Sequence, residues 1–316
     1  MSGLLLQQGV NALTIGAIYA LIALGYTMVY GVMRLINFAH GEMFMLGAYV
    51  ALISAGVVLP VAGFSPAMVV VGVILFSFVL VGIIGVVTER VAYKPLRNSS
   101  KLAPMLSALG LSLVLQAGMQ IIAGPQPIAF PTLIKSESFE VAGAHLTSLQ
   151  IGIISMCVVL MLGLVYLVNR TRIGILIRAV AENHRTAALL GINVSKVISV
   201  VFLIGPGLGG VAGVFYACYY GVISPTMGVI VGLKAFTAAI LGGIGSIPGA
   251  MLGGFLLGFL EVFGTALLPV ITNGYLGTEY RDVFAFGVLI LVLLFRPAGL
   301  LGENVTVETG VQKREY

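Results

Sequence analysis

The sequence predicts an all-α polytopic membrane protein. Of its 316 residues, 59% are hydrophobic and only 9% are charged. A soluble domain carries about a quarter charged residues, so this composition does not fit a water-exposed surface. The apolar residues also form runs as long as the ~20 residues that a helix needs to cross a bilayer. We therefore expect a bundle of membrane-spanning helices without a soluble domain and without a nucleic-acid partner.

Nine apolar stretches account for the predicted bundle. Seven can cross the membrane as plain helices: 8–30, 67–87, 104–123, 149–168, 197–219, 248–268 and 281–296. Two more, 36–59 and 226–245, are hydrophobic but are interrupted by Gly and polar residues. We expect eight to ten transmembrane segments, two of them broken helices, in one transmembrane domain of residues 1–301. Residues 302–316 form a polar tail.

The start of the chain predicts a first span that stays in the mature protein rather than being cleaved as a signal peptide. No Lys or Arg precedes Arg34, so the basic segment that begins a cleaved signal peptide is missing. Cys157 and Cys218 fall inside predicted spans, where a thiol packs as a small apolar group. Two such residues predict neither a disulfide framework nor a metal site, and we expect no cofactor.

Charged loops predict the orientation. Residues 88–103 contain Arg90, Lys94, Arg97 and Lys101, and residues 169–196 contain Arg170, Arg172, Arg178, Arg185 and Lys196. Lys and Arg accumulate in cytoplasmic loops, so both segments are expected to face the cytoplasm. Residues 124–148 hold one Lys and two Glu, and their start, "GPQPIAFP", predicts an external turn. The tail at 302–316 is expected to be cytoplasmic.

A candidate internal repeat extends this topology. The segment "YGVMRLINFAHGEMFMLGAY" (30–49) resembles "YGVISPTMGVIVGLKAFTAAILGG" (220–243). Transporters often contain two such copies, and we interpret these as parallel ones. The first span would then correspond to 197–219 and begin on the same side. This interpretation places both termini in the cytoplasm.

The broken segments are where a substrate path is expected. Unwound backbone at membrane depth must be buried in protein or line a cavity, and polar side chains there are often functional. The candidate path residues are Asn37, His40 and Glu42 in the first copy, Lys234 in the second and Glu261 in the following span. Two interpretations remain open. These groups either pair structurally or lie near an interface, or they face the ammonium and carboxylate ends of a small zwitterion.

Glycines recur at intervals of four residues in the second half of the chain. The two stripes are Gly205, Gly209 and Gly213, and Gly245, Gly249 and Gly253. Such stripes let helix backbones approach closely in lipid. The run "GPGLGG" at 205–210 matches a nucleotide-binding pattern, but it lies inside a predicted span with no strand before it. The sequence also contains no Gly-Lys pair and hence no P-loop, so ATP, if used, binds to another chain.

The most polar run, "LIRAVAENHRTAALLGI" (176–192), predicts a cytoplasmic amphipathic helix at about 174–191. Arg178, Glu182 and Arg185 are spaced as neighbours on a helix, and Gly191 is a natural stop signal. The apolar stripe is expected to consist of Leu176, Val180, Ala187 and Leu190. The helix can lie on lipid headgroups or insert into a cleft of a partner protein. Its small residues favour the cleft.

Three motifs resemble a known family: "INFAHGEMFMLGAY", "RAVAENHRTAALLGI" and "AAILGGIGSIPGAMLGG". They are similar to LivH-type permease subunits of bacterial branched-chain amino-acid ABC importers, and the resemblance runs from about residue 8 to 301. It implies import of Leu, Ile and Val across the inner membrane and no enzymatic activity in this chain. It also implies a second, LivM-type permease subunit, two ATP-binding subunits and a periplasmic substrate-binding protein as partners.

In that family the segment matching Ala181–Gly191 is the coupling helix that docks into the ATPase, with Glu182 at the motif glutamate. Asn183 and His184 depart from the general pattern E-A-A-x-x-x-G, and Gly191 comes late. The residues implied to contact the ATPase are Arg178, Ala181, Glu182, Asn183, Arg185, Ala187 and Gly191.

Three other transport functions are alternatives to this one. Importers of urea or short-chain amides have similar permeases, and the binding protein largely selects the ligand. In an ion-coupled secondary transporter, Glu42 and Glu261 could carry protons, but that class has no need of a coupling helix. An ion channel is expected to show a ring of charges or a carbonyl filter, and none is evident.

Overall fold

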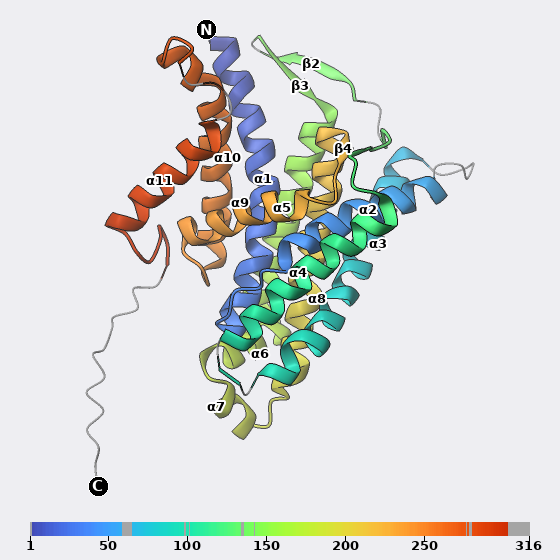
Figure 1. Cartoon of the computed structure of the whole chain (residues 1–316), viewed down its shortest axis with the longest axis vertical. Coiled ribbons are helices and arrows are strands. Elements are labelled where there is room, and N and C mark those ends of the chain that lie inside the picture. The colour runs from blue at the N-terminus through green and yellow to red at the C-terminus, as the bar shows by residue number, and fades with distance from the viewer. Residues whose placement is uncertain are drawn as a thin grey trace.

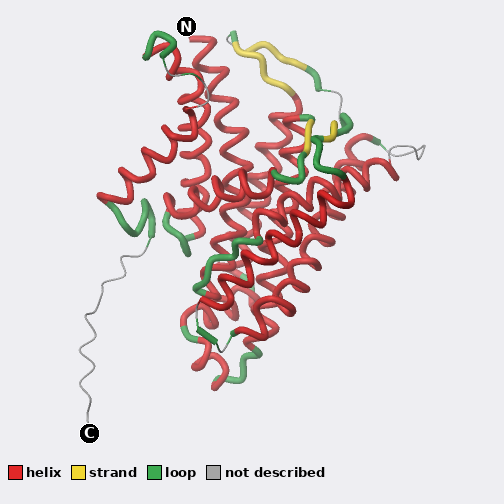
Figure 2. The backbone as a smooth tube through the Cα atoms, viewed as in Figure 1, coloured by secondary structure: helices red, strands yellow, loops and turns green. Residues whose placement is uncertain are grey.

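The structure of the protein is a computed structural model that describes residues 2–58, 65–97, 99–100, 102–133, 136–141, 143–275, 277 and 280–302. Most of the described residues are helical (Figure 2). In the described part, seven helices are long and apolar enough to cross a membrane, and two shorter apolar helices accompany them. These findings confirm the all-α polytopic class.

The helices follow the predicted spans closely. The long ones are α1 (Ser2–Met33), α2 (His40–Val58), α3 (Pro66–Thr88), α4 (Leu102–Ala123), α5 (Ser148–Arg170), α8 (Val194–Tyr220) and α10 (Ile247–Ile271). The shorter apolar ones are α9 (Met227–Gly242) and α11 (Arg281–Phe295). Two short turns of helix, η1 (Glu89–Tyr93) and η2 (Lys94–Leu96), follow α3, and two polar helices, α6 (Arg172–Glu182) and α7 (His184–Leu189), separate α5 from α8.

Among the residues that the structure describes, four short strands lie outside the bundle. Strands β2 (Ser138–Val141) and β3 (Ala144–Thr147) form an antiparallel hairpin, and β1 (Ile128–Ala129) pairs with β4 (Val222–Ile223). Thr147 then caps α5, because its side chain accepts from the backbone of Gln150 while the Gln150 side chain accepts from the backbone of Thr147. The hairpin therefore leads directly into a span.

The two interrupted stretches form continuous helices, α2 and α9. Their interruptions precede the helices, at residues 34–39 and 221–226. The first linker starts at the end of α1, and the second starts at the end of α8. In each case a linker precedes a shorter, unbroken helix, so neither helix is broken within itself.

The two copies run in opposite directions. Residues 8–15 of α1 lie beside Tyr219 and Tyr220 at the end of α8, whereas Gly25 lies against the backbone of Gly205. The predicted parallel arrangement is therefore wrong. The physical reason is that four spans, α2 to α5, lie between α1 and α8, so that the chain enters α8 from the opposite side. Sequence similarity between two copies carries no information about their direction.

The N-terminus lies at the end of the bundle away from α6 and α7 (Figure 1). There the Gln7 side chain accepts a hydrogen bond of 2.7 Å from the backbone N–H of His145, in the β2–β3 hairpin. The prediction that residue 1 shares a side with residues 169–196 is therefore wrong. Near the other terminus, the backbone of Leu300 and Leu301 donates to the last turn of α9. Residues 303–316 of the predicted tail lie outside the described residues.

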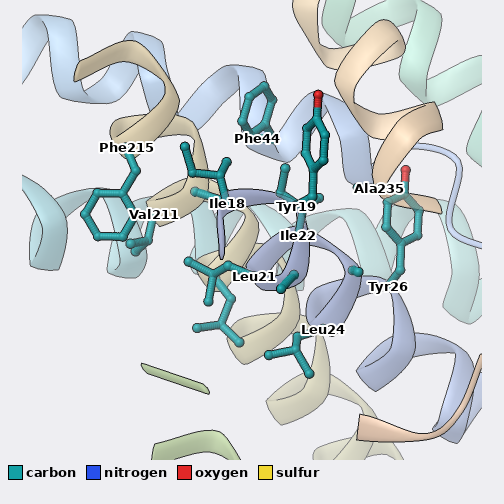
Figure 3. Packing of buried hydrophobic residues seen from close by; sticks show 14 of the residues in the cluster. Ile18, Tyr19, Leu21, Ile22, Leu24, Tyr26, Phe44, Val211, Phe215 and Ala235 are labelled. Atoms are coloured by element: carbon teal, nitrogen blue, oxygen red, sulfur yellow. The ribbon is translucent and has the colours of Figure 1, made fainter. Parts of the chain in front are cut away.

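Close helix packing depends on glycine. A side chain at Gly213 would overlap the backbone of Phe44, and one at Gly209 would meet the His40 ring, so these two glycines of α8 pack against α2, whereas Gly205 packs against Gly25 of α1. Gly253 similarly faces Ala238 of α9. Gly245 belongs to the turn before α10 and has a φ of 97°, so it is not part of a helical stripe. Figure 3 shows how Ile18, Phe44, Val211 and Phe215 fill the core where α1, α2 and α8 meet.

Candidate functional site

The predicted path residues fall into two clusters on different faces of α9. Gly228 and Gly232 of α9 pack against Gly41 at the start of α2. Lys234 instead contacts α10 and α11. Glu42 and Lys234 therefore do not face each other across one site.

The first cluster lies where α2 and α9 begin. The two linkers enter from opposite ends of the bundle, and each of the two helices starts at half depth. The depth follows from His40, the first residue of α2, which packs against Gly25 and Gly209 in the interiors of α1 and α8. The N-termini of α2 and α9 thus approach each other inside the protein. Helix N-termini carry partial positive charge, so this point favours an anionic group.

Glu42 supplies that anionic group. Its side chain is 1% exposed, and its Oε1 accepts a hydrogen bond of 3.1 Å from the Ser112 hydroxyl. A side chain at Gly228, in the first turn of α9, would collide with the other carboxylate oxygen. The Glu42 carboxylate therefore lies between the first turns of α2 and α9. This arrangement supports the structural interpretation of Glu42 more than contact with a substrate.

Asn37 and His40 hold the first linker in place. The Asn37 side-chain oxygen accepts from the Tyr93 hydroxyl at 2.7 Å and from the backbone N–H of Ala39 at 3.1 Å. The His40 ring is fully buried, and its centroid lies 4.5 Å from that of Tyr26. Both side chains are thus used for packing inside the chain.

The second cluster is an ion network in which the Lys234 and Glu261 side chains are buried and the Asp282 side chain is 40% exposed. The Lys234 ammonium lies 2.8 Å from Oε1 of Glu261 and 2.8 Å from Oδ1 of Asp282. The Tyr19 hydroxyl donates to Oε2 of Glu261 at 2.7 Å. Four helices, α1, α9, α10 and α11, are joined in this way. Sequence analysis missed Asp282 and Tyr19, although an acidic residue inside the apolar stretch 281–296 is a signal for the former.

A hollow of about 360 Å³ adjoins this network between α1, α8 and α10. Its lining residues are Gln8, Asn11, Ile15, Tyr219, Tyr220, Glu261, Val262, Thr265 and Ala266. Glu261 is the one residue shared by the hollow and the ion network. The volume is at the lower end of the ~300–1,000 Å³ range of small-molecule sites.

The polar segment forms two helices rather than one. Asn183 ends α6 with an extended backbone, and its side chain accepts from the backbone N–H of Thr186 to cap α7. Arg178 donates to the carbonyl oxygen of Val168. The predicted cluster of Arg178, Glu182 and Arg185 on one helix is therefore wrong, because the capping Asn interrupts the helix between Glu182 and Arg185.

The buried side of this segment also differs from the predicted stripe. Val180 and Ala187 are buried as expected, but Leu190 is 75% exposed and Leu189 is 82% exposed. Ala187 packs inside this chain and is thus turned away from any partner. Gly191 ends α7 as predicted, with a φ of 81° and a hydrogen bond from the next backbone N–H back to the carbonyl oxygen of Ala187.

Two contacts attach the segment to the end of α1. The His184 ring donates to the carbonyl oxygen of Val32 at 2.7 Å. The Arg34 guanidinium lies 3.4 Å from the carbonyl oxygen of Ala181. Arg34 itself begins the linker that leads to Asn37 and His40, and its φ of 52° marks the sharp change of chain direction. The polar segment and the first cluster are therefore connected through the end of α1.

Residues 9–293 match the family described as the permease component of the branched-chain amino acid transport system. This chain belongs to that permease family. The permease is 44% identical over 301 residues to the high-affinity branched-chain amino acid transport system permease protein BraD of Pseudomonas aeruginosa, covering 94% of this chain and 95% of that relative. These matches confirm the resemblance carried by the three motifs.

Two further relatives extend the range of the match. LivH of Escherichia coli (strain K12), a protein of the same description, is 44% identical over 314 residues, which cover 94% of this chain and 95% of that relative. A probable branched-chain amino acid transport permease protein LivH of Methanocaldococcus jannaschii is 30% identical over 302 residues, which cover 92% of this chain and 91% of that relative. The permease is thus similar to bacterial and archaeal proteins over nearly its whole length.

The permease also holds a buried carboxylate that sequence analysis missed. Glu89 is fully buried at the end of α3, where its two oxygens accept from Arg97 at 2.7 Å and from Ser199 at 3.0 Å. This pair ties the loop after α3 to the start of α8, near α6 and α7. The signal in the sequence was one acidic residue in a strongly basic loop.

Proposed function

We propose that the permease is the membrane-spanning subunit of an ABC importer for Leu, Ile and Val in the bacterial inner membrane. The names of the 44%-identical relatives support this substrate class. Two ATP-binding subunits supply the energy, a second permease subunit completes the membrane domain, and a periplasmic binding protein delivers the ligand. The permease itself performs no chemistry on the substrate.

The observation that carries this proposal is the exposed polar segment α6–α7. It projects from the end of the bundle (Figure 1), and the His184 ring attaches it to the last turn of α1. Its outer surface combines the charged side chains of Glu182 and Arg185 with the exposed leucines at 189 and 190. Charged groups around a few apolar anchors are the usual composition of a protein interface. We infer that this surface seats in a cleft of an ATP-binding subunit.

The same end of the bundle carries the basic loops. The loop after α3 packs through Glu89 against Ser199 at the start of α8, so it lies on the side of α6 and α7. By the positive-inside rule this side is cytoplasmic. The N-terminus and the β2–β3 hairpin are then periplasmic, and Gly302, beside the end of α9, leads into a cytoplasmic tail.

The mechanism that fits this arrangement is alternating access. Closure of the ATPase dimer moves α6 and α7, and the contacts of His184 and Arg34 pass that motion to the end of α1. The linker that follows leads to the point where α2 and α9 meet. A shift of these two helices against each other changes which side of the membrane the path faces.

The docking test uses Glu182→Lys and Leu189→Asp. Both side chains are exposed, so both variants are expected to fold and insert normally. An unpaired charge at a buried junction typically costs ~2–5 kcal/mol, enough to weaken assembly by about 30-fold or more. We expect loss of copurification with the ATP-binding subunits and of ligand-stimulated ATP hydrolysis.

The matched control is Glu140→Lys, the same charge reversal at an exposed position of the β2–β3 hairpin at the opposite end. It is expected to leave ATPase copurification unchanged. If Glu182→Lys and Leu189→Asp both retain full copurification and ATP hydrolysis, the docking surface is wrongly assigned and the ABC proposal loses its main support.

A further inference from the structure

The turn η1 joins the first linker to the start of α8. It is a turn of π-helix, because the backbone N–H of Lys94 donates to the carbonyl oxygen of Glu89, five residues back. Such turns are rare, and many of them lie at functional positions. Two side chains of η1, Glu89 and Tyr93, are buried in the protein. Each of them contacts a different element, so η1 forms a bridge.

One side of the bridge is anchored in the bundle. The Ser199 hydroxyl at the start of α8 donates to Glu89 at 3.0 Å. The Ser107 hydroxyl of α4 donates to a carbonyl oxygen of η1, also at 3.0 Å. The Tyr93 ring packs against Phe202 of α8, with 5.2 Å between the ring centroids. Together these contacts attach η1 to both α4 and α8.

The other side of the bridge is a single hydrogen bond to the first linker. The Tyr93 hydroxyl donates to Oδ1 of Asn37 at 2.7 Å, and the two residues are 1% and 2% exposed. The same oxygen accepts from the backbone N–H of Ala39, which orders the linker itself. In the described part of the chain, Nδ2 of Asn37 has no hydrogen-bond partner. The Tyr93 hydroxyl therefore makes the polar contact that attaches the Asn37 side chain to the rest of the bundle.

The first linker is thus held at two points by two different elements. At its start, the Arg34 guanidinium lies 3.4 Å from the carbonyl oxygen of Ala181 in α6. Three residues later, Asn37 is held by η1. Three residues span at most about 11 Å, so the linker between these points has little slack. A movement of α6 relative to η1 must therefore be taken up between Arg34 and Asn37.

We propose that Tyr93 is a positioning residue of the transport cycle, and that its hydrogen bond to Asn37 is a latch that keeps the cytoplasmic side of the permease closed. When α6 moves, the latch breaks and releases the linker together with the start of α2. The second linker is held separately at the opposite end, where Phe130 donates to the carbonyl oxygen of Gly221 at 2.8 Å. The latch therefore acts on the cytoplasmic side alone. It rests on the proposed function and adds to it the contact that α6 and α7 must break.

A labelling experiment tests the latch. Ala39, which is fully buried in the linker, is replaced by Cys in a Cys157→Ala, Cys218→Ala background. A membrane-impermeant maleimide is applied from the α6–α7 side to nucleotide-free vesicles that contain the permease with its proposed partners. Loss of one hydrogen bond in Tyr93→Phe is expected to raise the open population, and with it the labelling rate, by ~2- to 13-fold. Tyr166→Phe, the same change at an exposed tyrosine of α5, is the matched control and is expected to leave the rate unchanged.

A second reporter distinguishes a latch from general loosening of the protein. Ala217 is fully buried near the end of α8 on the N-terminal side, and Ala217→Cys is labelled from that side in the same background. Tyr93→Phe is expected to leave this second rate unchanged. An unchanged rate at position 39, or equal acceleration at positions 39 and 217, overturns the latch.

Asn37→Ala tests whether Tyr93 acts through Asn37. This variant is expected to accelerate labelling at position 39 by itself, so it also serves if Tyr93→Phe is not recovered as folded protein. Adding Tyr93→Phe to it is expected to cause no further acceleration, because both changes remove the same hydrogen bond. No acceleration in Asn37→Ala, or two effects that multiply, contradicts the assignment.

The failure of the latch and the failure of the proposed function are distinguishable. ATP-driven leucine uptake by the unmodified transporter tests the function without reference to Tyr93. If that uptake occurs and Tyr93→Phe does not accelerate labelling at position 39, the latch alone is rejected. If no ATP-driven uptake occurs, the proposed function fails whatever the labelling shows.

Discussion

Nε2 of His184 lies 2.7 Å from the carbonyl oxygen of Val32. The two residues belong to the polar helix α7 and to the last turn of α1, and they are 152 positions apart in the chain. The last carbonyl groups of a helix have no partner within it. The imidazole therefore donates a hydrogen bond to a carbonyl group that has no partner within α1. This contact makes the position of α7 depend on that of α1.

Replacing His184 tests whether this contact transmits force. Removing one such hydrogen bond costs about 0.5–1.5 kcal/mol, which corresponds to ~2- to 13-fold in an equilibrium. We expect His184→Ala to assemble with the ATP-binding subunits and hydrolyse ATP, but to import several-fold less leucine per ATP. The control is His145→Ala, whose side chain is exposed at the opposite end. An unchanged ratio of uptake to hydrolysis in His184→Ala would contradict a transmitting role.

The ion network predicts a large effect on stability. Lys234→Met leaves Glu261 buried without its cation, and breaking a buried ion pair in this way costs ~3–5 kcal/mol. We expect a clearly lower thermal unfolding temperature in detergent, and recovery of most of it in the neutral triple variant Lys234→Met, Glu261→Gln, Asp282→Asn. Lys196→Met, at an exposed lysine, is the control. A Lys234→Met protein as stable as the wild type would show that the network contributes little.

The glycine stripe of α8 predicts a contrast between two conservative substitutions. Gly213→Ala places a methyl group into the backbone of Phe44, so α8 and α2 must move apart. Gly163 of α5 has open space around the same position, and Ala there favours the helix by ~0.5–1 kcal/mol. We expect Gly213→Ala to lose folded protein in a detergent extraction and gel-filtration assay, and Gly163→Ala to match or exceed the wild type. Similar behaviour of the two variants would contradict the close packing of α8 on α2.

The inverted arrangement of the two copies predicts an accessible N-terminus. Because α1 and α8 run in opposite directions, a tag at residue 1 and a tag between residues 190 and 193 must lie on opposite sides of the membrane. We expect an impermeant reagent applied to intact cells to label the N-terminal tag alone. Labelling of both tags, or of neither, is incompatible with this topology.

Much of the fold could be predicted because long apolar runs have few alternatives in a membrane. The limits of α2, α9 and α11 follow the hydrophobic stretches within a few residues. The similarity of 30–49 to 220–243 could not reveal the direction of the second copy. A linker followed by a helix can form from the same local sequence whichever side of the membrane the chain enters from. Asn183 is a residue type that often caps helices, which is a signal for the break between α6 and α7. The helical pattern continues on both sides of it, so the segment was predicted as one helix.

The candidate site could be predicted only in part, because pairing depends on tertiary packing. Residue type and depth pointed to Glu42, Lys234 and Glu261, and all three are buried. The sequence did not reveal that Lys234 pairs with Glu261 and Asp282 while Glu42 lies at two helix N-termini. These partners come from helices far apart in the chain. The assignment of α6–α7 to an ATPase cleft remains a prediction.

The most direct test of the account is leucine uptake by proteoliposomes that contain the permease with the proposed partners: a second permease subunit, two ATP-binding subunits and a binding protein. We predict uptake of labelled leucine that requires ATP and the binding protein and that persists when proton and sodium gradients are abolished. Uptake that continues without ATP and collapses with either gradient would contradict the account and identify an ion-coupled transporter instead.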